Sequence, residues 1–148
     1  MKFHNCHNTV KRIEDKNPAT QYSGNTPLHL AAKMGHLDVC KLIIENVENK
    51  NPATHHSRET PLHFAAQNGH SDICSFLMEI VEENNSANFW RQTPLHLAAK
   101  RGHLDVCRII LENVKEKNPV DTYGHTPKDY AMQMNHLELL ELLEYYDI

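Results

Sequence analysis

Apolar and small residues recur in one order along the chain. The block Thr-Pro-Leu-His-x-Ala-Ala occurs at residues 26–32, 60–66 and 93–99, and a degenerate copy, Thr-Pro-Lys-Asp-Tyr-Ala-Met, occupies 126–132. The copies begin at Thr26, Thr60, Thr93 and Thr126, so the interval between them is almost constant. This interval is too regular for chance and too short for separate domains, so the sequence predicts a stack of similar supersecondary units.

Each block carries the signals that begin a short helix. Thr is a good N-cap residue, and Pro is tolerated at the first helical position because its missing N–H would have no partner there. The helix is expected to end at Gly35, Gly69 or Gly102, where glycine can adopt a left-handed conformation.

A second helix is predicted after each of these glycines. In the first unit Leu37, Cys40, Ile43 and Ile44 share one helical face, and Asp38 lies in the first turn, where the helix dipole favours an anion. The linkers between units contain turn-forming residues and are expected to form extended arms. Each unit is therefore predicted to consist of an arm, a helix, a turn and a second helix.

One unit alone has too few apolar residues to close a core, so neighbouring units must share one. The pairs of Ala in the first helices are expected to let helices approach closely. The cysteines Cys6, Cys40, Cys74 and Cys107 recur at the same interval as the block and are expected to face this shared core as small apolar groups. The predicted core comprises Leu28, Ala31, Ala32, Leu42, Ile43, Leu62, Ala65, Ala66, Phe76, Leu77, Leu95, Ala98, Ala99, Ile109 and Ile110.

The repeated block, with Gly-His-Leu at 35–37 and again at 102–104, resembles the signature of the ankyrin repeat family. The resemblance covers the chain from about Cys6 to its end. It implies an all-α fold, an ankyrin-repeat solenoid of helix-turn-helix units with short β-hairpin or turn arms. It also implies a protein-binding scaffold in which the imidazoles of His29, His63 and His96 hydrogen-bond the backbone of the neighbouring turn.

The arms differ from one another at one position. Gly24 and Gly124 occupy it in the first and fourth units, whereas Arg58 and Arg91 occupy it in the second and third. Because the family usually has glycine here, the two turns that carry arginine are expected to be strained or reshaped.

We expect a single ankyrin-repeat domain over 1–148. Cys6 precedes the first Asn-Pro pair by the same interval that separates Cys40 from the second pair, so the chain is expected to begin inside a repeat. The last unit departs from the signature and carries glutamates among the leucines of its final helix, which is typical of a polar cap. The expected parts are a partial leading repeat at 1–18, repeats at 19–52, 53–85 and 86–118, and a C-terminal capping repeat at 119–148.

Composition and charge exclude several classes of protein. Lys and Arg number 15 against 19 Asp and Glu, and this net charge of -4 disfavours nucleic-acid binding. No stretch approaches the roughly 18–20 apolar residues of a membrane-spanning helix, and the N-terminus lacks the apolar region of a signal peptide. Four thiols in such an array suit a reducing compartment, so a cytoplasmic location is expected, with the nucleus as the alternative.

Twelve histidines and four cysteines raise the alternative of a metal site, because pairs such as His36 and Cys40 have i,i+4 spacing. The repeat explains these pairs better, as turn and core residues. No nucleophile with a base, paired carboxylates or phosphate-binding loop emerges, since all five glycines fall in turns. We expect no enzymatic activity, no cofactor and no metal.

Positions that packing does not fix are free for recognition. The resemblance places the arm tips and the exposed ends of the first helices on one concave face. Trp90, the only tryptophan, is the strongest candidate because tryptophan often dominates binding interfaces. Tyr22, Phe89 and Tyr123 have the alternative role of packing their arms against the next unit. The candidate residues are Tyr22, Asn25, Lys33, Met34, His56, Arg58, Glu59, Gln67, Asn68, Trp90, Arg91, Lys100, Arg101, Tyr123 and His125.

Charge is also divided between two faces. Lys33, Arg58, Arg91, Lys100 and Arg101 fall on the predicted concave face, whereas glutamates cluster at the far ends of the second helices. This asymmetry predicts a protein partner with an acidic segment, although such charges are also typical of a solvated surface. The predicted function is a monomeric, non-catalytic protein-interaction scaffold. The alternative is a regulatory or targeting ankyrin segment of a larger protein whose activity lies outside this chain.

Overall fold

The computed structural model describes residues 16–147, so Cys6 and most of the predicted leading repeat lie outside the described residues. Within this range the chain forms eight α-helices and no β-strand, which confirms the predicted all-α solenoid. The arms are turns. The helices are α2 (Pro27–Met34), α3 (Leu37–Glu45), α4 (Pro61–Gln67), α5 (Ser71–Ile80), α6 (Pro94–Arg101), α7 (Leu104–Asn113), α8 (Pro127–Gln133) and α9 (Leu137–Tyr146).

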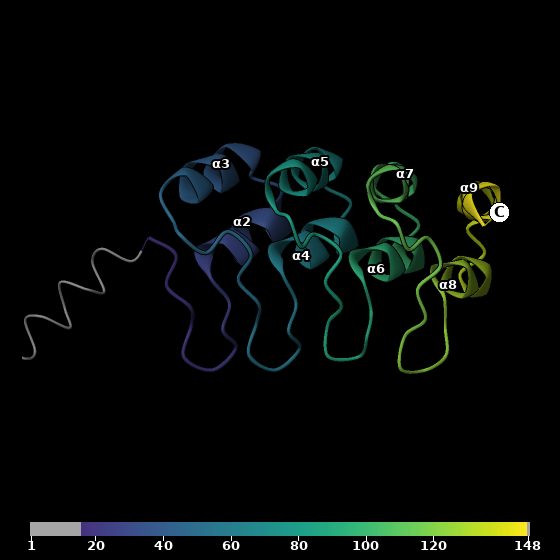
Figure 1. Ribbon diagram of the computed structural model, residues 1–148, viewed down its shortest axis with the longest axis horizontal. Coiled ribbons are helices and arrows are strands. Elements are labelled where there is room, and N and C mark those ends of the chain that lie inside the picture. The colour runs from purple at the N-terminus through teal and green to yellow at the C-terminus, as the bar shows by residue number, and fades with distance from the viewer. Residues whose placement is uncertain (1–15, 148) are drawn as a thin grey trace, which may run out of the picture.

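The helices form two layers (Figure 1). The first helices of the repeats, α2, α4, α6 and α8, stack side by side in one layer, and the second helices, α3, α5, α7 and α9, form the other. The arms project beyond the first-helix layer, away from the second helices. We call the surface formed by the arm tips and the first helices the groove face.

The signature histidines fix both their own helix and the next arm. In α2 the backbone N–H of Thr26 donates to Nδ1 of His29 (3.0 Å), and the N–H of His29 donates to the Thr26 hydroxyl oxygen (3.4 Å). With Nδ1 occupied as an acceptor, Nε2 carries the proton and donates to the carbonyl oxygen of Glu59 in the next arm (3.0 Å). Equivalent bonds join His63 to Gln92 and His96 to His125, at 3.1 Å each. The role implied by the family resemblance is confirmed.

A glycine ends the first helix of a repeat where the next repeat approaches closely. Gly35 has φ 79°, and a Cβ atom there would lie 2.7 Å from Cε1 of His70. His70 in turn donates from Nε2 to the carbonyl oxygen of Lys33, 2.9 Å away, so it satisfies the end of α2. The predicted left-handed glycines are thus confirmed, and each contact ties one repeat to the next.

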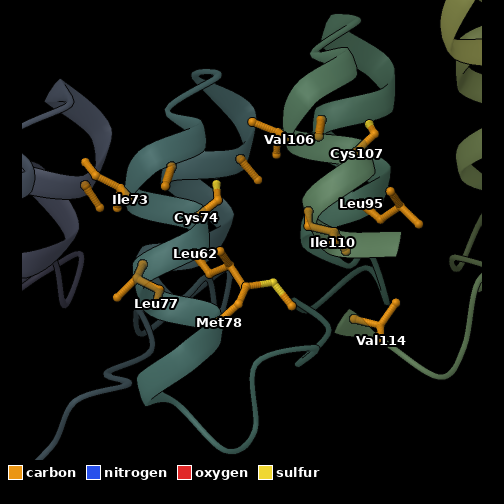
Figure 2. Packing of buried hydrophobic residues seen from close by; sticks show 14 of the residues in the cluster. Leu62, Ile73, Cys74, Leu77, Met78, Leu95, Val106, Cys107, Ile110 and Val114 are labelled. Carbon is orange, nitrogen blue, oxygen red and sulfur yellow. The ribbon is translucent and has the colours of Figure 1, made fainter. Parts of the chain in front are cut away.

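The shared core lies between the layers and between successive repeats. The described cysteines, Cys40, Cys74 and Cys107, are fully buried and unpaired, as predicted. Figure 2 shows Val106 of α7 in the space between α5 and α7, whereas Ile73 of α5 lies on the opposite side of α5, toward the preceding repeat. Most of the predicted core residues are buried, while Ile43, Phe76 and Ile109 are only partly buried.

The prediction that Leu42 belongs to the core is wrong, because its side chain is 63% exposed. Phe76 of α5 occupies the equivalent position one repeat later, and the centroid of its ring lies 5.6 Å from Nζ of Lys41 on α3, the second helix of the preceding repeat. Within residues 16–147 no helix precedes α3 on that side, so nothing described covers Leu42. Ile44 of α3 is buried instead.

Backbone hydrogen bonds join neighbouring arms. The N–H of His55 donates to Ser23 O (3.0 Å), and the N–H of Phe89 donates to Ser57 O (2.7 Å). A third bond joins the last two arms and runs from Thr122 N–H to Trp90 O (2.9 Å). These bonds hold the arm tips at fixed positions relative to one another.

Two arms contain arginine in a conformation that favours glycine. Arg58 has φ 57° and Arg91 has φ 58°, against 72° for Gly24 and 81° for Gly124. The predicted strain is therefore confirmed, since an L-residue with a side chain is energetically disfavoured at positive φ.

Candidate functional site

The groove face contains a basic cleft at the C-terminal ends of the first helices. Its volume is about 550 Å³. Lys33 comes from α2 and Arg101 from α6, so the cleft spans three repeats with α4 in the middle. The residues that define it are Lys33, Phe64, Gln67, Asn68, Arg101 and His103.

A second cleft, the aromatic cleft, lies beside the arm tips. Its volume is about 340 Å³. The rings of Phe89 and Trp90 meet edge to face with centroids 5.8 Å apart, and these side chains are 66% and 38% exposed. The residues that define it are Asn25, His56, Glu59, Phe64, Phe89 and Trp90, together with serine and threonine side chains of the first two arms.

Phe64 lines both clefts and was assigned by sequence reasoning only to the repeated framework. It is half-buried, and its ring packs edge to face on His29 at 5.5 Å. The signal in the sequence is an aromatic residue in the variable position of the signature, where Leu30 and Leu97 stand in the flanking repeats. Phe89, an arm-tip residue for which packing was the alternative role, is not among the predicted site residues, and it is more exposed than Trp90.

The structure brings eight of the predicted site residues into the two clefts and leaves seven outside them. Lys33, Gln67, Asn68 and Arg101 line the basic cleft, and Asn25, His56, Glu59 and Trp90 line the aromatic cleft. Lys100 lies with Nζ 5.5 Å from the ring centroid of Tyr130. The residues outside the clefts are Tyr22, Met34, Arg58, Arg91, Lys100, Tyr123 and His125.

The two clefts differ in charge. No acidic residue lines the basic cleft, and neither Lys33 nor Arg101 forms an ion pair with any of residues 16–147. The aromatic cleft contains one carboxylate, Glu59, which accepts a hydrogen bond from the Ser57 hydroxyl at 2.9 Å. An anion would therefore be favoured between the cations Lys33 and Arg101 and disfavoured beside Glu59.

A larger cleft, of about 620 Å³, lies between the first arm and the segment that follows α3. Lys16, Asn46, Glu48 and Pro52 are among its lining residues, and none of the predicted site residues reaches it.

The buried histidines and cysteines are held in their neutral forms. Burial lowers the pKa of His63 to about 4, against a smaller opposing effect of its bond to Gln92, and burial also lowers the pKa of His29 and His96. Burial raises the pKa of Cys74 to about 12. These groups serve packing and hydrogen bonding. Among residues 16–147 no three His, Cys, Asp or Glu side chains are placed to hold a metal ion.

Stacked helix pairs whose arms are joined by backbone hydrogen bonds define a helical repeat solenoid. The sequence matches the family model described as Ankyrin repeats (3 copies) over residues 2–88 and 79–148, so the chain belongs to the ankyrin repeat family. Ankyrin repeats are generally non-catalytic protein–protein interaction modules. A search of curated proteins found no significant match. None of the described helices has the length and apolar character needed to span a bilayer.

Proposed function

We propose that this chain is a protein-interaction module whose groove face binds a partner protein with an acidic segment. The observation that carries the proposal is the pair of clefts that meet at Phe64, one rich in exposed aromatic surface and the other in unpaired cations. Exposed aromatic and arginine side chains often dominate the energy of binding interfaces. Elsewhere the signature residues are buried in the framework and are not free for recognition.

The framework around the clefts favours binding without large rearrangement. Hydrogen bonds between arms and from His29 and His63 to the next arm hold the arm tips in register. Little ordering entropy is then lost when a partner docks, which supports affinity. The module is proposed to act as a monomer, and sedimentation equilibrium tests this.

Protein capture from a cell lysate tests the proposed face. The wild type is compared with a Trp90→Ala/Arg91→Ala/Arg101→Ala variant that stays folded by circular dichroism. A matched control, Arg108→Ala/Lys115→Ala/Tyr145→Ala, removes exposed side chains outside the groove face. A protein captured by the wild type and the control but lost with the groove variant supports the proposal. Equal capture by all three contradicts it.

The same experiment addresses the alternative, that the chain is a regulatory or targeting segment of a larger protein. That role predicts that the captured partner also binds the longer protein through the groove face. The buried free thiols support a cytoplasmic or nuclear location. Imaging of a fluorescent fusion in living cells tests the location.

A further inference from the structure

The two clefts lie toward opposite ends of one short helix. α4 begins at Pro61, directly after the second arm, and ends at Gln67 in the basic cleft; Phe64, midway along the helix, lines both clefts. At a rise of 1.5 Å per residue, the seven residues of α4 span about 10 Å. A ligand that follows α4 would touch both clefts within this short distance.

Charge sets the direction of such a ligand. Lys33 and Arg101 flank the C-terminal end of α4 without ion-pair partners among residues 16–147, while Glu59 lies in the aromatic cleft. A carboxylate is favoured between Lys33 and Arg101 and is repelled from Glu59. An uncharged apolar side chain is favoured against Phe89 and Trp90, whose rings are exposed.

Dimensions favour an extended segment over a helix. A helical ligand would need about seven residues to cover the length of α4, because it rises about 1.5 Å per residue, and would therefore order more residues on binding. An extended chain advances about 3.3 Å per residue, so three residues cover the about 10 Å length of α4.

Resting on the proposed function, we propose that the groove face binds an extended peptide segment that has a large apolar side chain and, about three residues away, an Asp or Glu. The apolar side chain occupies the aromatic cleft, against Phe64, Phe89 and Trp90. The carboxylate occupies the basic cleft, between Lys33 and Arg101. The two clefts together thus recognise one short motif, in which the apolar and the acidic residue have a fixed spacing.

Selection of random 12-residue peptides displayed on phage, with the full chain as bait, tests the motif. Peptides enriched on the wild type are expected to share an apolar residue and an acidic residue two to four positions apart. Peptides selected on Phe89→Ala/Trp90→Ala are expected to lose the preference for an apolar residue. Peptides selected on Lys33→Glu/Arg101→Glu are expected to lose the preference for an acidic residue. Arg108→Glu/Lys115→Glu, the same charge change at exposed residues outside the clefts, is expected to keep both. Circular dichroism confirms that each variant is folded.

The fluorescence of Trp90, the only tryptophan, then measures binding of an enriched peptide that lacks tryptophan. Its emission is expected to change on binding. The affinity is expected to fall about tenfold when the acidic residue of the peptide is replaced by its amide, or when Arg101 is replaced by Glu.

The outcomes separate this inference from the proposed function. In one outcome, enriched peptides bind through groove residues and yet lack an acidic residue; in another, they carry the apolar and acidic residues seven positions apart, as on a helix. Either result overturns this inference and leaves the proposed function standing. If the chain self-associates and Phe89→Ala abolishes this self-association, the clefts bind a second copy of the chain. This result also overturns the inference of a peptide ligand. If no enriched peptide depends on any groove residue, both the inference and the proposed function fail.

Discussion

The phenolic hydroxyl of Tyr130 in α8 donates a 2.6 Å hydrogen bond to the carboxylate of Asp121, which begins the fourth arm. Asp121 also accepts hydrogen bonds from the backbone N–H groups of Tyr123 and His125, at 2.9 Å each. Burial raises the pKa of Asp121, but these hydrogen bonds outweigh burial and lower it. The ionised carboxylate therefore organises the last arm and ties it to its helix.

Tyr130→Phe is expected to destabilise the protein by about 1–2 kcal/mol, because a hydrogen bond to a buried charged group is lost. Urea unfolding followed by circular dichroism measures the change. Tyr145→Phe is the matched control, since Tyr145 is highly exposed and the same atom is removed. Equal stability of the two variants would show that the bond to Asp121 contributes nothing.

Acid is expected to destabilise the array through its buried histidines. Burial lowers the pKa of His63 to about 4, whereas the unfolded value is about 6.5. The neutral folded form is therefore favoured above pH 6.5, and its stabilisation is lost as the pH falls from about 6.5 to about 4. The loss between pH 7 and pH 5 is expected to be about 2 kcal/mol from His63 alone.

The slope of unfolding free energy against pH isolates this contribution. In His63→Gln the number of protons taken up on unfolding near pH 5 is expected to fall by about one, because the substituted side chain does not titrate. The same substitution at an exposed histidine, His36→Gln, is the matched control for the change of side chain. If His63→Gln leaves the slope unchanged, the predicted contribution of His63 to acid destabilisation is contradicted.

Two leucines that sequence reasoning placed in the core are expected to behave differently. Leu77 is 1% exposed, and Leu77→Ala is expected to cost about 2–5 kcal/mol, because it removes apolar contacts and leaves a cavity. Leu42 is 63% exposed, so Leu42→Ala is expected to cost less than about 0.5 kcal/mol. Denaturant unfolding measures both. If Leu42→Ala costs as much as Leu77→Ala, another part of the chain must cover Leu42.

The left-handed arginine in the second arm predicts a stabilising substitution. Arg58→Gly is expected to stabilise the protein by about 0.5–1 kcal/mol, because glycine adopts φ 57° without a steric penalty. The same change at Arg108, in the interior of α7, is expected to cost about 1 kcal/mol, since glycine weakens a helix. Thermal unfolding of the two variants should shift in opposite directions; a destabilised Arg58→Gly would mean that its side chain makes compensating contacts.

Sequence reasoning predicted what depends on local signals. Thr26 and Pro27 begin α2 and Gly35 ends it, because capping and left-handed turns depend on the residue type itself. The burial of Leu42 was mispredicted because it depends on a neighbouring helix, which a repeat pattern supplies only inside the array. Phe64 was missed for a similar reason. Its position is variable in the signature, and the clefts on either side of it are completed by residues of the neighbouring repeats.

The charge of the basic cleft predicts that partner binding depends on salt. Lys33 and Arg101 are exposed and unpaired within residues 16–147, so dissolved ions compete directly with an acidic partner for them. Once a partner has been captured, its affinity for the wild type is expected to fall several-fold between about 50 mM and about 500 mM NaCl, as calorimetry would measure.

Arg101→Glu is expected to weaken binding at low salt and to flatten the salt dependence, because attraction is replaced by repulsion. Arg108→Glu changes the net charge equally but lies outside the clefts, so it should leave the salt dependence intact. If both substitutions flatten it equally, the effect comes from net charge, and the basic cleft has no specific role.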